Sequence, residues 1–185
     1  SGGGSNMQRL IEDMATSHVG RVALVLSNTV TASGLNKAKA MGVKTKLIDH
    51  DSYEADLQTF DDTLQEYLLA HSIDIICLAG FMRVLGEKFV REWEGRILNI
   101  HPSLLPKFKG LNTHQRAIDA GESLAGCSVH EVRAKLDAGP ILNQASLSIL
   151  PEDTAVSLAA RVLELEHQLY PATLRSFLTQ KTSRN

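Results

Sequence analysis

The sequence contains few of the residues that mark specialised protein classes. Only two cysteines occur among 185 residues, and Cys77 and Cys127 lie far apart in apolar stretches. This argues against a disulfide framework and predicts two reduced, buried thiols in a cytoplasmic protein. No apolar run approaches the length that spans a membrane. The formal net charge of −2 lacks the basic excess of a nucleic-acid-binding protein, so we expect small-molecule partners, no nucleic acid and no membrane.

The length and composition fit a single globular domain. Apolar residues make up 43% and charged residues 22% of the chain, which is ordinary for a soluble protein. A chain of this size can bury most of its apolar surface in one core without stabilisation by disulfides or metal ions. We expect one domain over residues 1–185.

Strand-like and helix-like segments alternate through the first two thirds of the chain. Short apolar runs typical of buried strands occur at 21–27, 43–49, 73–80 and 95–100. The third run is almost continuously apolar, which predicts a strand buried on both faces. Helical patterns lie between the first three runs, at 33–42 and 53–72. This order is the βαβ rhythm of a parallel sheet.

The last third of the chain has a different pattern. Residues 126–132 and 139–150 alternate enough to predict antiparallel strands near one edge of the sheet, and a long helix is expected from about 154 to 178. The predicted fold class is α/β, with a doubly wound, mostly parallel sheet that is Rossmann-like in its N-terminal half and has antiparallel additions near the C-terminal half.

Asn99 and His101 lie two residues apart at the end of a predicted strand, so their side chains project from the same face. An amide N–H and an imidazolium directed at one carbonyl oxygen would stabilise the negative charge that develops when that carbonyl is attacked. Pro102 and Pro106 follow and stiffen the backbone. The pattern favours acyl transfer. The alternative is that Asn99 and His101 serve only backbone groups of a loop.

Asp137 lies in the turn LDAGP. Its carboxylate could orient His101 and favour the charged imidazole, or it could serve only to stabilise the turn. A metal site formed by His101, His114 and His130 is not favoured, because no pair of them has the close spacing of zinc ligands.

The first six residues, SGGGSN, allow two interpretations. A Gly/Ser stretch can be a flexible linker, or it can be a turn that binds phosphate through backbone N–H groups at a helix N-terminus. In the second case Gly2, Gly3 and Gly4 allow close approach of the phosphate, and Ser5 caps the helix.

Separated motifs, in the same order along the chain, resemble those of the phosphoribosylglycinamide formyltransferases, within the formyltetrahydrofolate-dependent formyltransferase superfamily. The motifs are SGGGSN before an apolar helix, LAGFMR at 78–83, ILNIHPSLLPKFKG at 97–110, SVHEV and LDAGPI within 128–141, and RVLELEHQLYP at 161–171. The stretch GLNTHQRAI at 110–118 favours this family over the methionyl-tRNA formyltransferases. The resemblance covers nearly the whole chain and supports the phosphate-loop interpretation of SGGGSN.

The resemblance implies transfer of a formyl group from 10-formyltetrahydrofolate, a co-substrate, to the amine of 5-phosphoribosylglycinamide in de novo purine biosynthesis, without a metal. Asn99 and His101 would stabilise the oxyanion of a tetrahedral intermediate. Asp137 would position His101 and a water that relays protons. His130 resembles a family histidine near the site, or it is a packed strand residue.

The resemblance also implies two binding regions. The acceptor would be bound by Gly4, Ser5, Asn6 and Glu166, although Glu166 could instead be a solvent-facing helix residue. Phe81 would support the folate pocket. The folate itself would be bound by backbone groups and apolar side chains of Met82, Arg83, Val84, Leu85, Ala134, Lys135 and Leu136. The phosphate-binding half would span about 1–98 and the catalytic and folate-binding half about 99–185.

The chain departs from the family pattern in three ways. Asn112 and Leu163 stand where some relatives have histidine and a polar or basic residue, so substrate affinity is expected to differ. The tail after Leu178 is short. The chain begins at the phosphate loop, so we expect a further apolar strand of about six residues before Ser1, and a one-strand gap of about 9.5 Å between the strands at 21–27 and 73–79.

Two other functions stay open. In a formyltetrahydrofolate deformylase, water replaces the acceptor amine, and the phosphate loop argues against this because a hydrolase has no phosphorylated acceptor to bind. In a non-catalytic nucleotide-binding module, Asn99, His101 and Asp137 would have no purpose. We expect a monomer or a homodimer.

Overall fold

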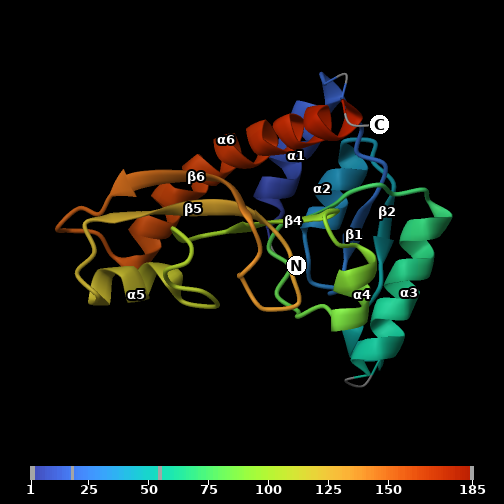
Figure 1. The fold of residues 1–185 in the computed structure, drawn as a ribbon, viewed down its shortest axis with the longest axis horizontal. Coiled ribbons are helices and arrows are strands. Elements are labelled where there is room, and N and C mark those ends of the chain that lie inside the picture. The colour runs from blue at the N-terminus through green and yellow to red at the C-terminus, as the bar shows by residue number, and fades with distance from the viewer. Residues whose placement is uncertain (1–2, 18, 54–55, 184–185) are drawn as a thin grey trace.

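Helices and strands alternate along the part of the chain that the computed structural model describes, residues 3–17, 19–53 and 56–183 (Figure 1). The helices are α1 (Ser5–Ala15), α2 (Gly34–Ala40), α3 (Leu57–Ala70), α4 (Glu87–Glu92), α5 (Thr113–Asp119) and α6 (Ala155–Thr182), with the 3-10 helix η1 (His50–Tyr53). The strands are β1 (Val25–Ser27), β2 (Thr45–Leu47), β3 (Ile76–Leu78), β4 (Ile97–His101), β5 (Leu124–Glu131) and β6 (Ile141–Ser148). The short helices α4 and α5 were not predicted from the sequence.

The strands form two sheets. β1 and β2 pair in parallel, and a second sheet has the order β3-β4-β5-β6. Within the second sheet β3 and β4 are parallel, whereas the pairings of β4 with β5 and of β5 with β6 are antiparallel. The predicted α/β class, with antiparallel strands added in the C-terminal half, is confirmed.

β1 and β3 belong to different sheets and do not pair with each other in the part of the chain described. Residues 19–28, residues 71–79 and side chains of α1 line a cavity of about 480 Å³. The absence of direct pairing agrees with the expected gap between these strands. The expectation that the third apolar run is buried on both faces is wrong, because the residues of β3 line this cavity and are half-buried.

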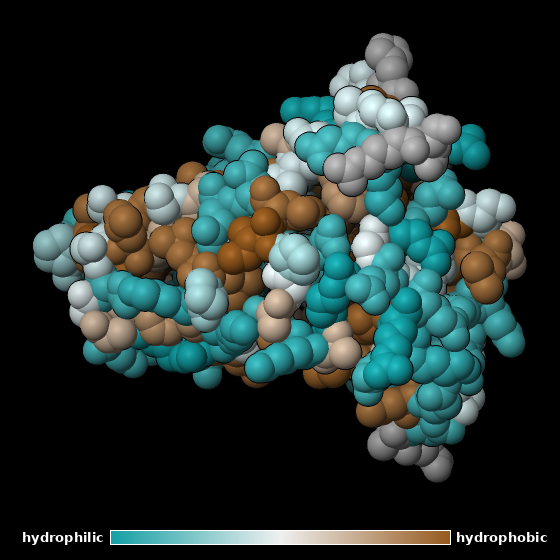
Figure 2. Space-filling view, viewed as in Figure 1, coloured by the Kyte–Doolittle hydropathy of each residue, from teal (hydrophilic) through white to brown (hydrophobic). Residues whose placement is uncertain are grey.

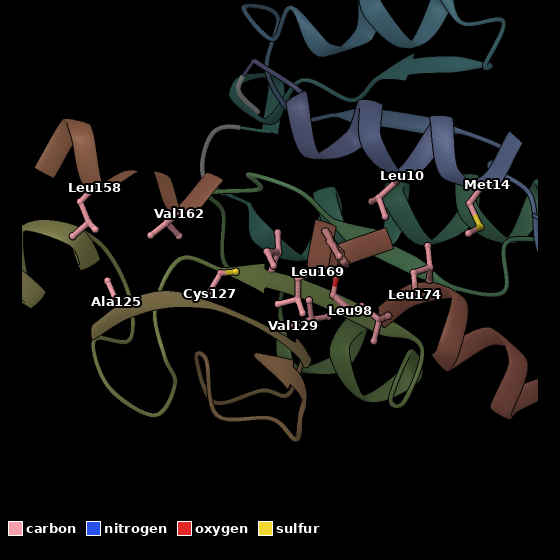
Figure 3. Close-up of a cluster of buried hydrophobic side chains, with 12 residues drawn as sticks. Leu10, Met14, Leu98, Ala125, Cys127, Val129, Leu158, Val162, Leu169 and Leu174 are labelled. Carbon is pink, nitrogen blue, oxygen red and sulfur yellow. Dashed lines mark hydrogen bonds between the residues drawn. The ribbon is translucent and has the colours of Figure 1, made fainter. Parts of the chain in front are cut away.

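The larger hydrophobic cluster lies between the four-stranded sheet and the helices α1 and α6 (Figure 3). Leu10 and Met14 of α1, Leu98 of β4, and Leu169 and Leu174 of α6 are among its buried members. The Tyr170 hydroxyl lies 3.0 Å from the carbonyl oxygen of Leu78 and 3.1 Å from that of Leu98. This side chain therefore ties α6 to β3 and β4, directly before Asn99.

A second cluster surrounds Trp93, at the end of α4. The indole is 1% exposed, and its Nε1–H donates to the side-chain oxygen of Gln65 on α3 at 2.8 Å. The guanidinium of Arg96 lies 4.4 Å from the ring centroid. Leu85 and Phe89 are buried beside it, so this cluster fixes the segment that leads into α4 against α3.

The surface over α3 is mainly hydrophilic in the view of Figure 2, whereas hydrophobic residues gather over the end of the molecule formed by β5 and β6. Leu124 and Ile141, at the start of these two strands, are among the exposed apolar side chains. Among the residues described, no helix is long and apolar enough to cross a membrane.

Candidate active site

Four polar side chains meet where β4 ends. Asn99 and His101 lie on β4, whose antiparallel partner β5 places His130 opposite Asn99. The Asn99 Nδ2 lies 3.2 Å from His130 Nε2. The Asp137 carboxylate lies between the two imidazoles, with Oδ2 3.4 Å from His101 Nδ1 and Oδ1 3.6 Å from His130 Nε2. The structure therefore brings together the three predicted catalytic residues and places His130, the histidine expected near the site or as a packed strand residue, in contact with them.

The contacts of His130 define its protonation. Its Nδ1 lies 3.0 Å from the carbonyl oxygen of Glu131, which can only accept, so Nδ1 carries the proton. Nε2 is then the acceptor for the Asn99 amide. Burial lowers the pKa of His130, opposed by the Glu131 carbonyl and the Asp137 charge. A neutral His130 fixes the orientation of the Asn99 side chain.

His101 and Asp137 are held by the loop that follows β4. His101 Nε2 donates to the carbonyl oxygen of Phe108 at 3.0 Å, so both of its ring nitrogens face oxygens. The backbone N–H of Gly110 donates to Asp137 Oδ2 at 2.9 Å. The side chains of His101 and Asp137 are each 7% exposed. The prediction that Asp137 orients His101 agrees with this geometry.

Side chains of β5 and β6 fix the loop over residues 102–108. The Ser128 hydroxyl donates to the Ser103 carbonyl at 2.6 Å and accepts from the Leu105 N–H at 3.0 Å. Gln144 Nε2 donates to the Leu105 carbonyl at 3.0 Å and to the Ser128 hydroxyl at 2.8 Å. The sequence analysis missed Ser128 and Gln144, which only the register of the two antiparallel strands could have placed beside the loop.

We expect the substitution Ser128→Ala to lower the free energy of unfolding by about 2 kcal/mol, because it leaves buried partners without a hydrogen bond. Urea unfolding of the variant and the wild type measures the difference. Ser146→Ala is the control, since Ser146 is exposed on β6 and should change stability by less than about 0.5 kcal/mol. Equal stabilities for the two variants would contradict the role of Ser128.

The first turn of α1 has backbone N–H groups that find no partner within the helix itself. Gly4 is the N-cap, in the left-handed conformation with φ of 72°, and no side chain of the residues described caps the helix. The prediction that Ser5 is the cap is wrong, because Ser5 is the first residue inside α1. The Lys37 Nζ donates to the carbonyl of Gly3 at 2.8 Å, which brings a cation to this loop. Gly2 lies outside the residues described.

Asn6 and Glu166 are joined across 160 residues of sequence. The Asn6 Nδ2 donates to Glu166 Oε2 at 2.6 Å, while Asn6 Oδ1 is buried and has no partner among the residues that the structure describes. Glu166 is 7% exposed, so its alternative interpretation as a solvent-facing residue is wrong. Burial raises the pKa of Glu166, and the hydrogen bond from Asn6 acts in the opposite direction. The Asn6 Oδ1 atom of this pair can therefore still accept a hydrogen bond.

The residues predicted to bind folate form two exposed segments. Met82 and Val84 are 68% and 62% exposed, whereas Leu85 is buried and Arg83 is half-buried. Ala134, Lys135 and Leu136 are exposed in the turn before Asp137. Val132, which precedes that turn, packs against the same cluster as Leu85. The cluster therefore connects the two segments.

The described part of the chain has no group of three or more His, Cys, Asp or Glu side chains arranged to bind a metal ion. Cys77 and Cys127 are free thiols, and burial raises the pKa of each to about 12. Asn112, where some relatives were expected to carry histidine, is the left-handed N-cap of α5 with φ of 57°. Asparagine tolerates this conformation well.

Comparison with known proteins identifies relatives over most of the chain. Residues 1–174 match the family described as formyl transferase. The chain is 40% identical over 178 residues to the phosphoribosylglycinamide formyltransferase of Haemophilus influenzae, a match that covers 96% of this chain and 84% of the relative. It is 44% identical over 176 residues to the trifunctional purine biosynthetic protein adenosine-3 of Bos taurus. That match covers 95% of this chain but only 17% of the length of the bovine protein.

The fold also matches solved structures. The crystal structure of phosphoribosylglycinamide formyltransferase from Brucella melitensis is 49% identical, with a TM-score of 0.91 over 96% of this chain and 92% of that one. The glycinamide ribonucleotide transformylase 1 of Symbiobacterium toebii is 40% identical, with a TM-score of 0.93 over 97% of this chain and 85% of that one. The arrangement of strands and helices is therefore shared with these enzymes.

Proposed function

This chain belongs to the formyl transferase family, and on that premise we propose that it transfers the formyl group of 10-formyltetrahydrofolate to the amine of 5-phosphoribosylglycinamide in purine synthesis. One observation carries this proposal beyond family membership. Asn99, His101, His130 and Asp137 form one cluster of close polar contacts at the end of β4. A donor amide, a donor imidazole and a carboxylate are the groups that acyl transfer to an amine requires.

The reaction begins when the acceptor amine attacks the formyl carbon, which the folate co-substrate supplies. A carbon–nitrogen bond forms, and the formyl oxygen becomes an oxyanion. Asn99 Nδ2 donates a hydrogen bond to that oxyanion, and His101, whose ring nitrogens face Phe108 and Asp137, stabilises the negative charge from beside it. His130 holds the Asn99 amide in place through its unprotonated Nε2. The oxyanion is thus stabilised by groups that are fixed before the reaction.

Asp137 positions His101 and accepts the proton that the attacking amine loses, directly or through a water. The oxyanion then returns to a carbonyl as the bond from the formyl carbon to the folate nitrogen breaks, and that nitrogen takes the proton from Asp137, directly or through the water. The carboxylate is held for this task by the Gly110 N–H and lies between His101 and His130. Atoms and charge balance without a metal ion or a nucleoside triphosphate.

The acceptor phosphate binds at the N-terminus of α1. The backbone of Gly4, Ser5 and Asn6 supplies N–H groups, and the helix dipole favours an anion there. Lys37 adds a positive charge at the same loop. Glu166 accepts hydrogen bonds from ribose hydroxyls beside Asn6. The single domain 1–185 thus has a phosphate-binding half, at about 1–98, and a catalytic and folate-binding half, at about 99–185.

The folate binds between the segments 82–85 and 134–136. Exposed apolar side chains fit the flat, largely apolar face of a pterin ring, and the exposed fractions of Met82, Val84 and Leu136 support this assignment. Backbone groups of Arg83, Leu85, Ala134 and Lys135 would bind the polar edge of the ring. The two segments approach one cluster through Leu85 and Val132.

A single assay tests the proposal. Formation of tetrahydrofolate from 10-formyltetrahydrofolate is followed with and without 5-phosphoribosylglycinamide. We expect turnover that depends on the ribonucleotide and yields the formylated ribonucleotide. Turnover at the same rate without the ribonucleotide would instead identify a deformylase, and binding of either compound without turnover would identify a non-catalytic module.

We expect Gly4→Val to raise the KM for the ribonucleotide by about tenfold, because a side chain at this left-handed position strains the loop that binds phosphate. A Cβ at Gly4 would lie 2.8 Å from the Gly34 Cα. The KM for the folate should change by less than about twofold. Gly42→Val is the control, since Gly42 has φ of 77° and lies away from the loop. A similar rise in both KM values would indicate damage to the fold.

The same proposal includes a cellular location and an assembly state for the enzyme. Two free thiols and the absence of a membrane-spanning helix among the residues described support a location in the cytoplasm. The expected assembly is a monomer or a homodimer, with the two small molecules as its partners.

A further inference from the structure

Asp61 is a buried carboxylate outside the catalytic cluster. It lies on α3 between Phe60 and Asp62 and is 4% exposed. Its Oδ1 is buried and has no hydrogen-bond partner within the described part of the chain. Burial raises the pKa of Asp61, and the hydrogen bond from Gly86 and the charge of Arg83 act in the opposite direction. Burying a carboxylate costs stability, so we expect the buried Asp61 to have a function.

Two of the groups that act on Asp61 lie in or beside the segment proposed to bind folate: Arg83 is within it, and Gly86 directly follows it. The backbone N–H of Gly86 donates to Asp61 Oδ2 at 2.6 Å. The guanidinium of Arg83 lies 4.3 Å from the ring centroid of Phe60, the residue before Asp61. Two of the Arg83 nitrogens, Nε and Nη2, are buried and have no hydrogen-bond partner among the residues described. The Asp61 carboxylate interacts electrostatically with this cation, which packs on an aromatic ring.

Side chains in this segment alternate in direction. Met82 and Val84 are exposed, whereas Leu85 is buried and the Arg83 guanidinium turns inward onto α3. Gly86 ends the segment as the N-cap of α4. Asp61 thus contacts Gly86, at the end of the segment, and acts electrostatically on Arg83, in its middle. Because Gly86 and Arg83 are held in place, the backbone groups of residues 82–85 are held in place as well.

We propose that Asp61 is a positioning residue for the formyl donor: it holds the segment 82–86 so that the backbone of 82–85 meets the folate ring. The inference rests on the proposed function, because it assigns this segment to folate. It adds a residue that contacts neither substrate. A residue with this role changes donor binding without changing the chemistry at Asn99 or the binding of the ribonucleotide.

Steady-state kinetics of the full chain test the inference with two variants and a control. Asp61→Ala removes the acceptor for the Gly86 N–H and the carboxylate that acts electrostatically on Arg83. It should raise the KM for 10-formyltetrahydrofolate by about tenfold. Asp61→Asn keeps an oxygen acceptor and should raise it by about threefold. For both variants, kcat and the KM for the ribonucleotide should stay within about twofold of the wild type.

Asp62→Asn is the control. It removes a carboxylate from the next position of the same helix, where Asp62 lies 3.1 Å from Lys88 in a half-exposed ion pair. Its donor KM should equal that of the wild type, as expected for a surface pair. A rise in the donor KM for Asp62→Asn as large as for Asp61→Asn would overturn the inference, because the effect would then be one of general charge.

The remaining outcomes are also decisive. An unchanged donor KM in folded Asp61→Ala, or an equal rise in both KM values, overturns the inference. If Asp61→Ala does not fold, Asp61→Asn decides by the same criteria. A failure of the proposed function has a different signature, since the wild type itself would then show no ribonucleotide-dependent formation of tetrahydrofolate. In that case titration calorimetry with tetrahydrofolate decides, and a dissociation constant that Asp61→Asn leaves unchanged overturns the inference.

Discussion

Replacing Asn99 by alanine should reduce kcat by roughly 10²–10³-fold, or about 3 kcal/mol of transition-state stabilisation, the scale for removing one oxyanion donor. Asn99 Nδ2 is the amide group that the buried, neutral His130 orients at 3.2 Å. Because the bond to the formyl oxygen strengthens as that oxygen becomes charged, the KM values should change much less than kcat.

The control for this prediction is Asn143→Ala. Asn143 lies on β6 in register with Val129 but is exposed, so its loss should leave kcat unchanged. Thermal unfolding of Asn99→Ala checks that the loss of the hydrogen bond to His130 has not unfolded the site. A folded Asn99→Ala with near-normal turnover would refute the assignment of Asn99 as the oxyanion donor.

Replacing Asp137 by asparagine should reduce kcat by roughly 10²–10⁴-fold, the range for loss of a positioned acid–base group. Asparagine suits this test because Asp137 has φ of 45°, a conformation that asparagine adopts more readily than most residues. It can also accept the hydrogen bond from the Gly110 N–H. The substitution therefore removes the negative charge beside His101 and His130 and leaves the turn in place.

Asp119→Asn provides the comparison. Asp119 accepts a hydrogen bond from Gln115 on the exposed surface of α5, and its replacement should leave kcat and both KM values unchanged. Measurement of kcat at saturating concentrations of both substrates separates the chemical step from binding. A loss of less than about tenfold in folded Asp137→Asn would contradict the proposed proton transfer.

The site residues differ in how far the sequence alone could identify them. Asn99 and His101 were predictable because strand periodicity places alternate residues on one face, and β4 ends at His101 as that interpretation requires. The link to Asp137 was one of two open alternatives, because a turn aspartate has the same local sequence whether or not it faces a histidine. The structure places the two side chains 3.4 Å apart, which is consistent with the first alternative.

Glu166 and Asp61 show what the sequence could not reveal. Each is a charged residue on a helix and is followed directly by a polar residue, His167 or Asp62. Their burial comes from contacts with distant segments, with Asn6 in one case and Gly86 in the other. Charged residues are rarely buried unless they are paired, so a sequence-based expectation of exposure is reasonable. Glu166 and Asp61 are nevertheless buried, because tertiary contacts and not the local sequence decide burial.

Element boundaries had a similar limit. The expected strand at 21–27 is regular only over Val25–Ser27, where β2 supplies a partner, and α6 continues to Thr182, beyond the expected end at 178. The helices α4 and α5 span six and seven residues. Segments this short contain less than two turns and give almost no periodic signal.

The position of Trp93 gives the molecule a built-in optical reporter. It is the one tryptophan of the chain, and it lies between α3 and α4 in the cluster that contains Leu85, apart from the larger cluster around α6. Its fluorescence therefore follows the α3–α4 part of the molecule, whereas the far-ultraviolet circular dichroism is dominated by helices that include the 28-residue α6. Comparing the two signals during denaturation measures whether the two clusters unfold as one cooperative unit.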